Sequence, residues 1–138
     1  MKLLIFLMFL SSFSAFAQRN PQIRVCNLNG GHFWSLDITK PADDNIGFCR
    51  YNNSLIGSLS LIQHFHFSRD TFAMKAYKES ARISYSSCSD AGAKTIIGTD
   101  SEGGSWDICQ FKDYSFVLEK TLTEGYYSPF NQSLSDSL

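Results

Sequence analysis

The chain lacks the motifs that mark most small enzymes. It contains no Gly-x-Ser-x-Gly, no His-Glu-x-x-His and no Cys-x-x-Cys, so nothing in it specifies a serine nucleophile, a zinc protease site or a redox pair. Basic stripes are also missing, because 12 Lys and Arg are balanced by 13 Asp and Glu for a net charge of −1. We therefore expect no catalytic residues, no cofactor and no nucleic-acid partner.

Long apolar runs are absent beyond the first seventeen residues. The single run, Leu3 to Leu10, follows Lys2 and precedes the small-x-small pattern Ala15-Phe16-Ala17. This order predicts a secretory signal peptide over residues 1–17 that is cleaved before Gln18. A membrane anchor is the alternative, but the run is too short to span a bilayer comfortably. We expect an exported protein, periplasmic or secreted, with no transmembrane segment in the mature chain.

Cysteine is scarce, and its spacing is the most informative feature of the chain. Of the four cysteines, Cys26 and Cys49 have 22 residues between them, and Cys88 and Cys109 have 20. Four cysteines in an exported chain predict two disulfides, with three possible pairings. A metal site is the competing interpretation, but the spacing of zinc ligands is missing.

The two halves of the chain match each other. Residues after Cys26 align with those after Cys88 at an offset of 62, and residues around Cys49 align with those around Cys109 at an offset of 60. This predicts an old duplication of one disulfide-closed unit, and hence pairing within each unit. The alternative is that two hairpins resemble each other because all hairpins share a pattern.

The periodicity predicts an α+β fold, mostly antiparallel β. We expect two small disulfide-closed three-stranded units joined by one helix. Alternation predicts a half-buried strand over 32–38, and Asn52-Asn53 predicts a tight hairpin turn. A strand-like stretch over 54–67, broken near Gly57, follows, and apolar residues at helical spacing place the helix over residues 68–83. The predicted organisation is a signal peptide at 1–17, a first unit at 18–67, a helical connector at 68–86, a second unit at 87–125 and a tail at 126–138. The tail is expected to be mobile unless its aromatic residues dock on the body.

Residues 20–61 resemble a family of short bacterial exported domains of unknown function, often labelled putative hemolysins. The matching residues are Asn20-Pro21, Cys26, Gly30-Gly31, Gly47-Phe48-Cys49 and Asn52-Asn53. The match is partial in the second unit, and the family's further Cys and acidic-Trp segment have no counterpart near residues 58–63. The resemblance implies a role in a bacterial envelope and suggests membrane activity, but it supplies no catalytic residues.

Two histidines are the metal candidates. On the expected strand, His64 and His66 would face the same side and could bind one ion, with His32 as a third ligand. The alternative is two exposed histidines flanking core-facing phenylalanines.

Aromatic residues make up 14% of the chain. They serve either as the core of two small units or as an exposed binding face, for which the candidates are Phe33, Trp34, Tyr51 and Trp106.

These observations favour a non-catalytic exported binding module that acts on a protein or on an envelope glycan, with an inhibitor as one form. The second hypothesis is a membrane-active, hemolysin-like protein that contacts the membrane surface through the 68–83 helix. The third is a small metal-dependent hydrolase that uses His64 and His66.

Overall fold

A closed barrel of six antiparallel strands forms the body of the molecule. The structure is a computed structural model and describes residues 20–38 and 43–138, so the predicted signal peptide lies outside the described residues. The strand order around the barrel is β1-β2-β3-β6-β5-β4. The strands are β1 (His32–Ile38), β2 (Asp44–Tyr51), β3 (Ser54–Gly57), β4 (Lys94–Thr99), β5 (Ser105–Gln110) and β6 (Phe116–Leu118).

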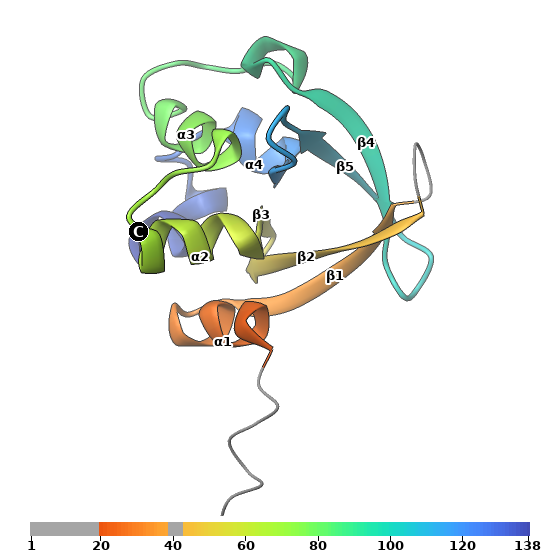
Figure 1. The fold of residues 1–138 in the computed structure, drawn as a ribbon. Helices are drawn as coiled ribbons and strands as arrows, with labels where there is room; N and C mark the ends of the chain where they lie inside the picture. The colour runs from red at the N-terminus through yellow and green to blue at the C-terminus, as the bar shows by residue number, and fades with distance from the viewer. Residues whose placement is uncertain (1–19, 39–42) are drawn as a thin grey trace, which may run out of the picture.

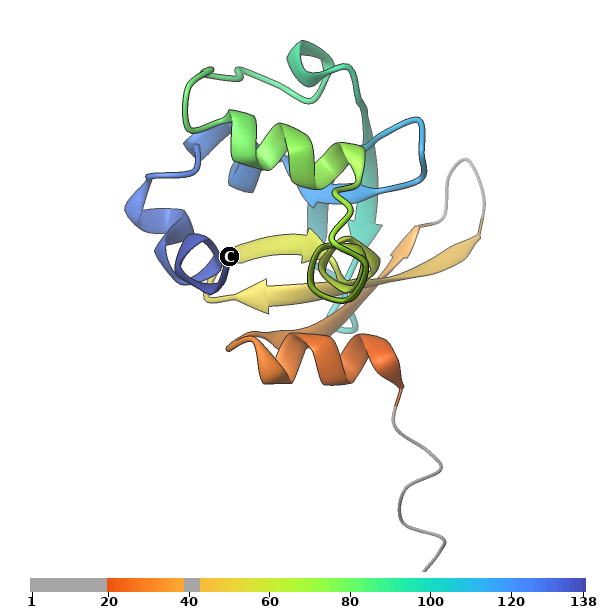
Figure 2. The same cartoon turned by 60° about the vertical axis from the view of Figure 1, so that its left-hand side comes forward.

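Short helices cover the outside of the barrel. They are α1 (Pro21–Leu28), α2 (Ser58–Phe67), α3 (Phe72–Glu79), α4 (Glu119–Glu124) and α5 (Gln132–Ser137), with single 3₁₀ turns η1 (Ser89–Ala91) and η2 (Pro129–Asn131). In Figure 1 the long strands meet on the right, and the helices lie below and to the left of them. Figure 2 looks along α2, which lies between α1 and α3.

The alternation of apolar residues explains why these segments are strands. Trp34, Leu36 and Ile38 of β1 point to one face, which becomes the barrel interior. A second core lies outside the barrel, between its wall and the helices, and contains both disulfides. The strand predicted over residues 32–38 and the turn predicted at Asn52-Asn53 are confirmed.

The disulfides join Cys26 to Cys49 and Cys88 to Cys109, which confirms the predicted pairing. The first bond ties α1 to β2, and the second ties the start of η1 to β5. Each closes a loop of just over twenty residues, which contributes about 3 kcal/mol in the chain-entropy model.

The α+β class and the antiparallel strands are confirmed, but the two separate units joined by a connector helix are not formed. β1 pairs with β4 at Ile38–Gly98, and β3 pairs with β6 at Ile56–Val117. A three-stranded sheet has two edges with unpaired backbone groups, and pairing both edges of one sheet with those of the other removes all four. The result is one barrel instead of two units.

The break expected near Gly57 is confirmed, but the residues after it form a helix instead of a strand, and the helix expected over 68–83 is shorter, α3 at Phe72–Glu79. β3 ends at Gly57, and α2 continues to Phe67 because Leu61 and Phe65 pack on the outer core at helical spacing. Ser68 then ends α2 in the left-handed conformation, with φ 48°, and Thr71 caps α3 by accepting the Met74 N–H.

The element order repeats along the chain. A first half, α1-β1-β2-β3-α2-α3, is followed by η1-β4-β5-β6-α4-η2-α5. The last helix of each half contacts the other half: Ser115 Oγ accepts the Ala73 N–H of α3, and Ser133 Oγ of α5 accepts from the Asn52 amide. Helix α3 is thus the counterpart of α5. A duplicated chain would produce this order, and the duplication itself stays a prediction.

The segment after Gly125 docks on the barrel, the alternative that the sequence left open. Asn131 is fully buried, and its amide group donates to the carbonyls of Thr121 and Gly125. Leu134 of α5 is fully buried as well. The tail therefore closes one side of the outer core.

We predict that Asn131→Ala destabilises the protein by about 2 to 4 kcal/mol, because it leaves buried carbonyls without donors. Urea unfolding would measure the loss. Gln132→Ala is the matched control, because the Gln132 side chain is exposed and bonds only to Asp136. Equal midpoints for the two variants would contradict a docked tail.

Candidate functional site

The shortness of β3 leaves part of β2 uncovered. β3 lies opposite only the second half of β2, from Phe48 to Tyr51. The first half, Asp44–Gly47, has no strand beside it on that side within the described residues. A groove of about 750 Å³ lies along this uncovered half.

Helices and a turn from both halves of the chain build the walls of this groove, which we call groove 1. On the apolar side, Leu59 of α2 and Phe72 of α3 are 57% and 46% exposed. The β5–β6 turn with Tyr114 also lines the groove, and the Tyr114 hydroxyl donates to Asp44 at 2.7 Å. This hydrogen bond raises the pKa of the Tyr114 phenol. Exposed apolar groups lining a concave surface are typical of a binding site.

Two glycines form the floor of groove 1. A Cβ on Gly47 would lie 2.9 Å from Ser58 Oγ, and one on Gly57 would lie 3.2 Å from the Phe116 carbonyl oxygen. The Ser58 hydroxyl approaches Gly47 O at 3.0 Å and Gln22 Oε1 at 2.5 Å. A side chain at either Gly47 or Gly57 would collide with these neighbours, so both positions require glycine.

The other half of the chain has a smaller groove of about 420 Å³, at the position that the predicted repeat would relate to groove 1. At the repeat offsets of 60 and 61, Trp106 replaces Ile46, Leu118 replaces Gly57 and Lys120 replaces Leu59. Phe130 of the docked tail also lines it. Larger side chains thus stand at three of the aligned positions of the smaller groove.

An ion cluster fixes one end of groove 1. Asp70 accepts from His64 Nδ1 at 2.8 Å and from Lys78 Nζ at 2.7 Å. Partial burial works to raise the pKa of Asp70, but the hydrogen bonds and charges of Lys78 and His64 outweigh it and hold that pKa below its usual value. The cluster ties α2, which carries His64, to α3, which carries Lys78.

The other charged side chains of groove 1 differ in the hydrogen bonds that they make. Asp113 accepts the N–H groups of Phe72 and Ser115, so its carboxylate is already engaged. Arg69 and Lys75 have no ion-pair partner among residues 20–38 and 43–138. Asp44 and Asp113 have no cationic partner among the described residues either, so groove 1 presents charge of both signs next to apolar surface.

The aromatic candidates do not form one exposed face. Tyr51 is only 2% exposed, and Phe33 packs on the outer core. Trp34 and Trp106 come together edge to face at 5.8 Å, with the Arg50 guanidinium 3.9 Å from the Trp34 ring. They pack partly buried against the interior core and lie outside groove 1.

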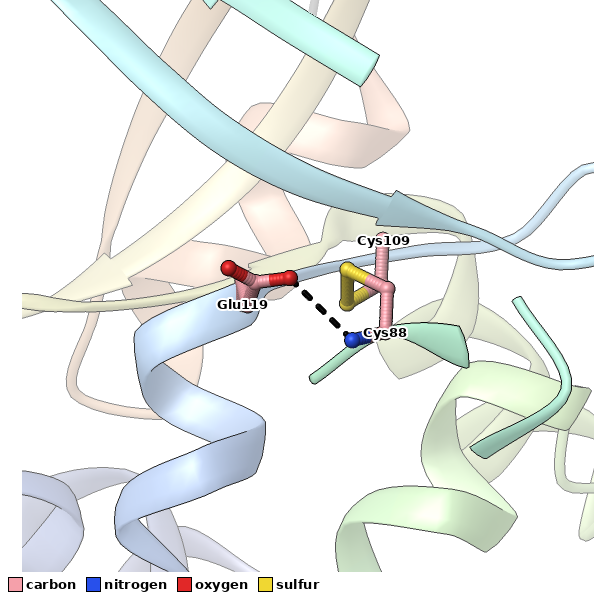
Figure 3. A group of neighbouring side chains, drawn as sticks. All are labelled: Cys88, Cys109 and Glu119. Carbon is pink, nitrogen blue, oxygen red and sulfur yellow. Dashed lines mark hydrogen bonds between the residues drawn. A yellow bond between two sulfur atoms is a disulfide. The ribbon is translucent and has the colours of Figure 1, made fainter. Parts of the chain in front are cut away.

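The histidine pair does not take the geometry that a shared ion requires. His64 and His66 lie on α2, where residues two apart point in different directions, and His64 is already bonded to Asp70. Within the described residues the clustered metal-type ligands are Cys88, Cys109 and Glu119 (Figure 3). Both sulfurs belong to the disulfide, and Glu119 accepts the Cys88 N–H. Thiolate ligands are thus not available there.

The helix expected to contact membranes, α3, packs its apolar face on the protein itself. Ala73, Met74, Ala76 and Tyr77 form the apolar face of α3, and all four are buried in the outer core. Among the described residues, no helix is long and apolar enough to cross a bilayer.

Comparison with known proteins gave no match: no family model, no curated protein and no solved structure is significantly similar to this chain. The resemblance to the exported hemolysin-labelled family stays a prediction.

We predict that Asp70→Asn lowers stability by up to about 1 kcal/mol near pH 6. The lowered pKa of Asp70 means that its contribution is complete above the unfolded value of about 3.9 and is lost as the pH falls through the folded value. The deficit should therefore vanish between about pH 4 and pH 2. Thermal unfolding across this range measures it, and a deficit that persists at pH 2 would contradict the ion cluster.

Proposed function

We propose that this protein is a non-catalytic exported module that binds another protein through groove 1. The observation that carries the proposal is the open groove of about 750 Å³ with exposed Leu59 and Phe72 on its wall. The aliphatic Leu59 suits a protein side chain better than a polar sugar, so we favour a protein partner over an envelope glycan.

The state of the polar groups supports a binding role. The Asp113 carboxylate holds the start of α3, the Asp44 carboxylate holds Tyr114, and the Ser58 hydroxyl is held by Gly47 and Gln22. Each is occupied by a contact that shapes the groove. No acid is placed beside a hydroxyl nucleophile with a histidine as base in groove 1.

The rigidity of the scaffold supports the same role. Two disulfides and a closed barrel hold the walls in place before a partner arrives. A preorganised site loses less entropy on binding. An inhibitor that occupies a partner's functional surface is one form that such a module would take.

The test is site-specific photocross-linking in cells that produce the full chain. A photoreactive amino acid at Leu59 should give a covalent adduct with one protein. The control position is Leu28, which is 67% exposed on α1 and lies outside groove 1. No adduct at residue 59, or the same adducts at both positions, would contradict binding through the groove.

A further inference from the structure

Asn29 and Gly30 form the one Asn-Gly pair in the chain, and they lie directly after α1. Asn29 is the C-cap of α1, and Gly30 follows with a φ of 85°, in the left-handed region that glycine adopts without strain. A Cβ on Gly30 would meet no atom within 4 Å, so the turn is open around its backbone nitrogen. The Gly30 N–H has no backbone acceptor among residues 20–38 and 43–138. This nitrogen is therefore free to react with the side chain that precedes it.

An asparagine followed by glycine reacts readily with its own backbone. The nitrogen of the glycine forms a bond to Cγ, the Cγ–Nδ2 bond breaks, and ammonia leaves with the proton of the backbone amide. Water then opens the cyclic imide at either carbonyl, which gives aspartate or isoaspartate. A residue other than glycine places a Cβ beside the attacking nitrogen and slows the first step, whereas glycine leaves the approach open. The reaction consumes only water.

The native structure holds the Asn29 side chain away from this reaction. Its Nδ2 donates to the Val25 carbonyl at 2.7 Å, and its N–H donates to the Cys26 carbonyl at 3.2 Å. Ring closure requires the side chain to leave Val25 and ψ to rotate away from the observed 20°. The Gly31 N–H also donates to the Cys26 carbonyl, at 2.9 Å, which resists that rotation. The rate of the reaction therefore depends on how often the end of α1 opens.

The product of the reaction cannot make the same cap. At neutral pH the side chain of aspartate or isoaspartate has only acceptors, so it cannot donate to the Val25 carbonyl. Its negative charge also lies at the C-terminus of α1, where the last carbonyls already concentrate negative partial charge. Isoaspartate in addition lengthens the backbone by one methylene, which shifts Gly31 relative to Cys26. Each product therefore loosens the end of α1 that carries Cys26.

We propose that Asn29 is a site of spontaneous deamidation, and that its conversion loosens α1 and opens the Cys26–Cys49 disulfide to reduction. This bond joins α1 to β2, and both sulfurs are buried in the outer core while α1 is in place. A dithiol, which is itself oxidised to a disulfide as it reduces Cys26–Cys49, reaches these sulfurs only after α1 opens. The modification is a one-way switch that acts on the first disulfide, and it is independent of ligand binding at groove 1.

The second disulfide supplies a reference within the same molecule. Cys88–Cys109 joins the start of η1 to β5 in the other half of the chain. The loop that it closes contains no asparagine. Its rate of reduction should therefore stay the same when Asn29 converts.

The first experiment follows conversion by peptide mapping and mass spectrometry at mildly alkaline pH, in the oxidised native protein and in the reduced protein unfolded in urea. Asn27 is the internal control, because it is exposed on α1 and is followed by Leu28. In the unfolded chain Asn29 should convert several-fold faster than Asn27. The native fold should slow Asn29 by on the order of tenfold or more. Equal rates at the two asparagines in the unfolded chain, or equal rates at Asn29 in the two states, would overturn the proposal.

The second experiment separates loss of the cap from addition of charge. Asn29→Asp removes the donor to Val25, whereas Asn27→Asp adds the same charge to the same helix and leaves that donor in place. Asn29→Asp should raise the rate at which dithiothreitol reduces Cys26–Cys49 by on the order of fivefold, with Asn27→Asp close to wild type. Equal acceleration in both variants, or none in Asn29→Asp, would overturn the coupling to the disulfide.

Aged wild-type protein gives the same comparison without a variant that has to fold. In a partly converted sample, the converted molecules should lose the Cys26–Cys49 bond first, while Cys88–Cys109 is reduced equally in converted and unconverted molecules. Mass spectrometry after quenching with an alkylating reagent reads both bonds. Loss of both disulfides together in the converted molecules would show general unfolding and would overturn a switch confined to α1.

Discussion

Pairing between the two halves of the chain is the contact on which the rest of the structure depends. β1 joins β4 and β3 joins β6, so that neither three-stranded sheet keeps a free edge at its ends. Closure places the apolar faces of all six strands inward and leaves their outer faces for the helices. Because β3 and β6 are short, closure is complete at one level of the barrel only. The uncovered half of β2, and with it groove 1, is a direct consequence of this geometry.

The two cores and the cross-links stabilise the fold, whereas groove 1 is the part of the surface that they leave open. The interior core and the outer core are both filled, and the disulfides and Asn131 hold the outer layer to the barrel. A chain of this size has a small core and gains from such cross-links. Groove 1 lies where the two halves meet, with α2 from one side and the β5–β6 turn from the other. The walls of groove 1 are thus anchored in different halves of the chain.

Local pattern was sufficient for part of this structure. The strand at 32–38 alternates without interruption, and the repeat of cysteine spacing led to the correct disulfide pairing. The helix α2 was missed because Leu59, Leu61 and the aromatic residues after them fit a strand as well as a helix, and the choice depends on the outer core. Groove 1 could not be predicted, since Leu59 and Tyr114 come together only when the barrel closes. Gly47 was visible in the sequence motif, but its role depends on Ser58 and Gln22 beside it.

Amide hydrogen exchange of the free protein, followed residue by residue by NMR, tests the central claim most directly. If the first half of β2 is an open edge, protection should alternate along it. Ile46 and Phe48, which face β1, should exchange slowly, whereas Asn45 and Gly47 should exchange rapidly. Cys49 and Tyr51, which face β3, should be protected again. Protection of Asn45 and Gly47 equal to that of Ile46 and Phe48 would mean that the edge is already covered, and would contradict the account.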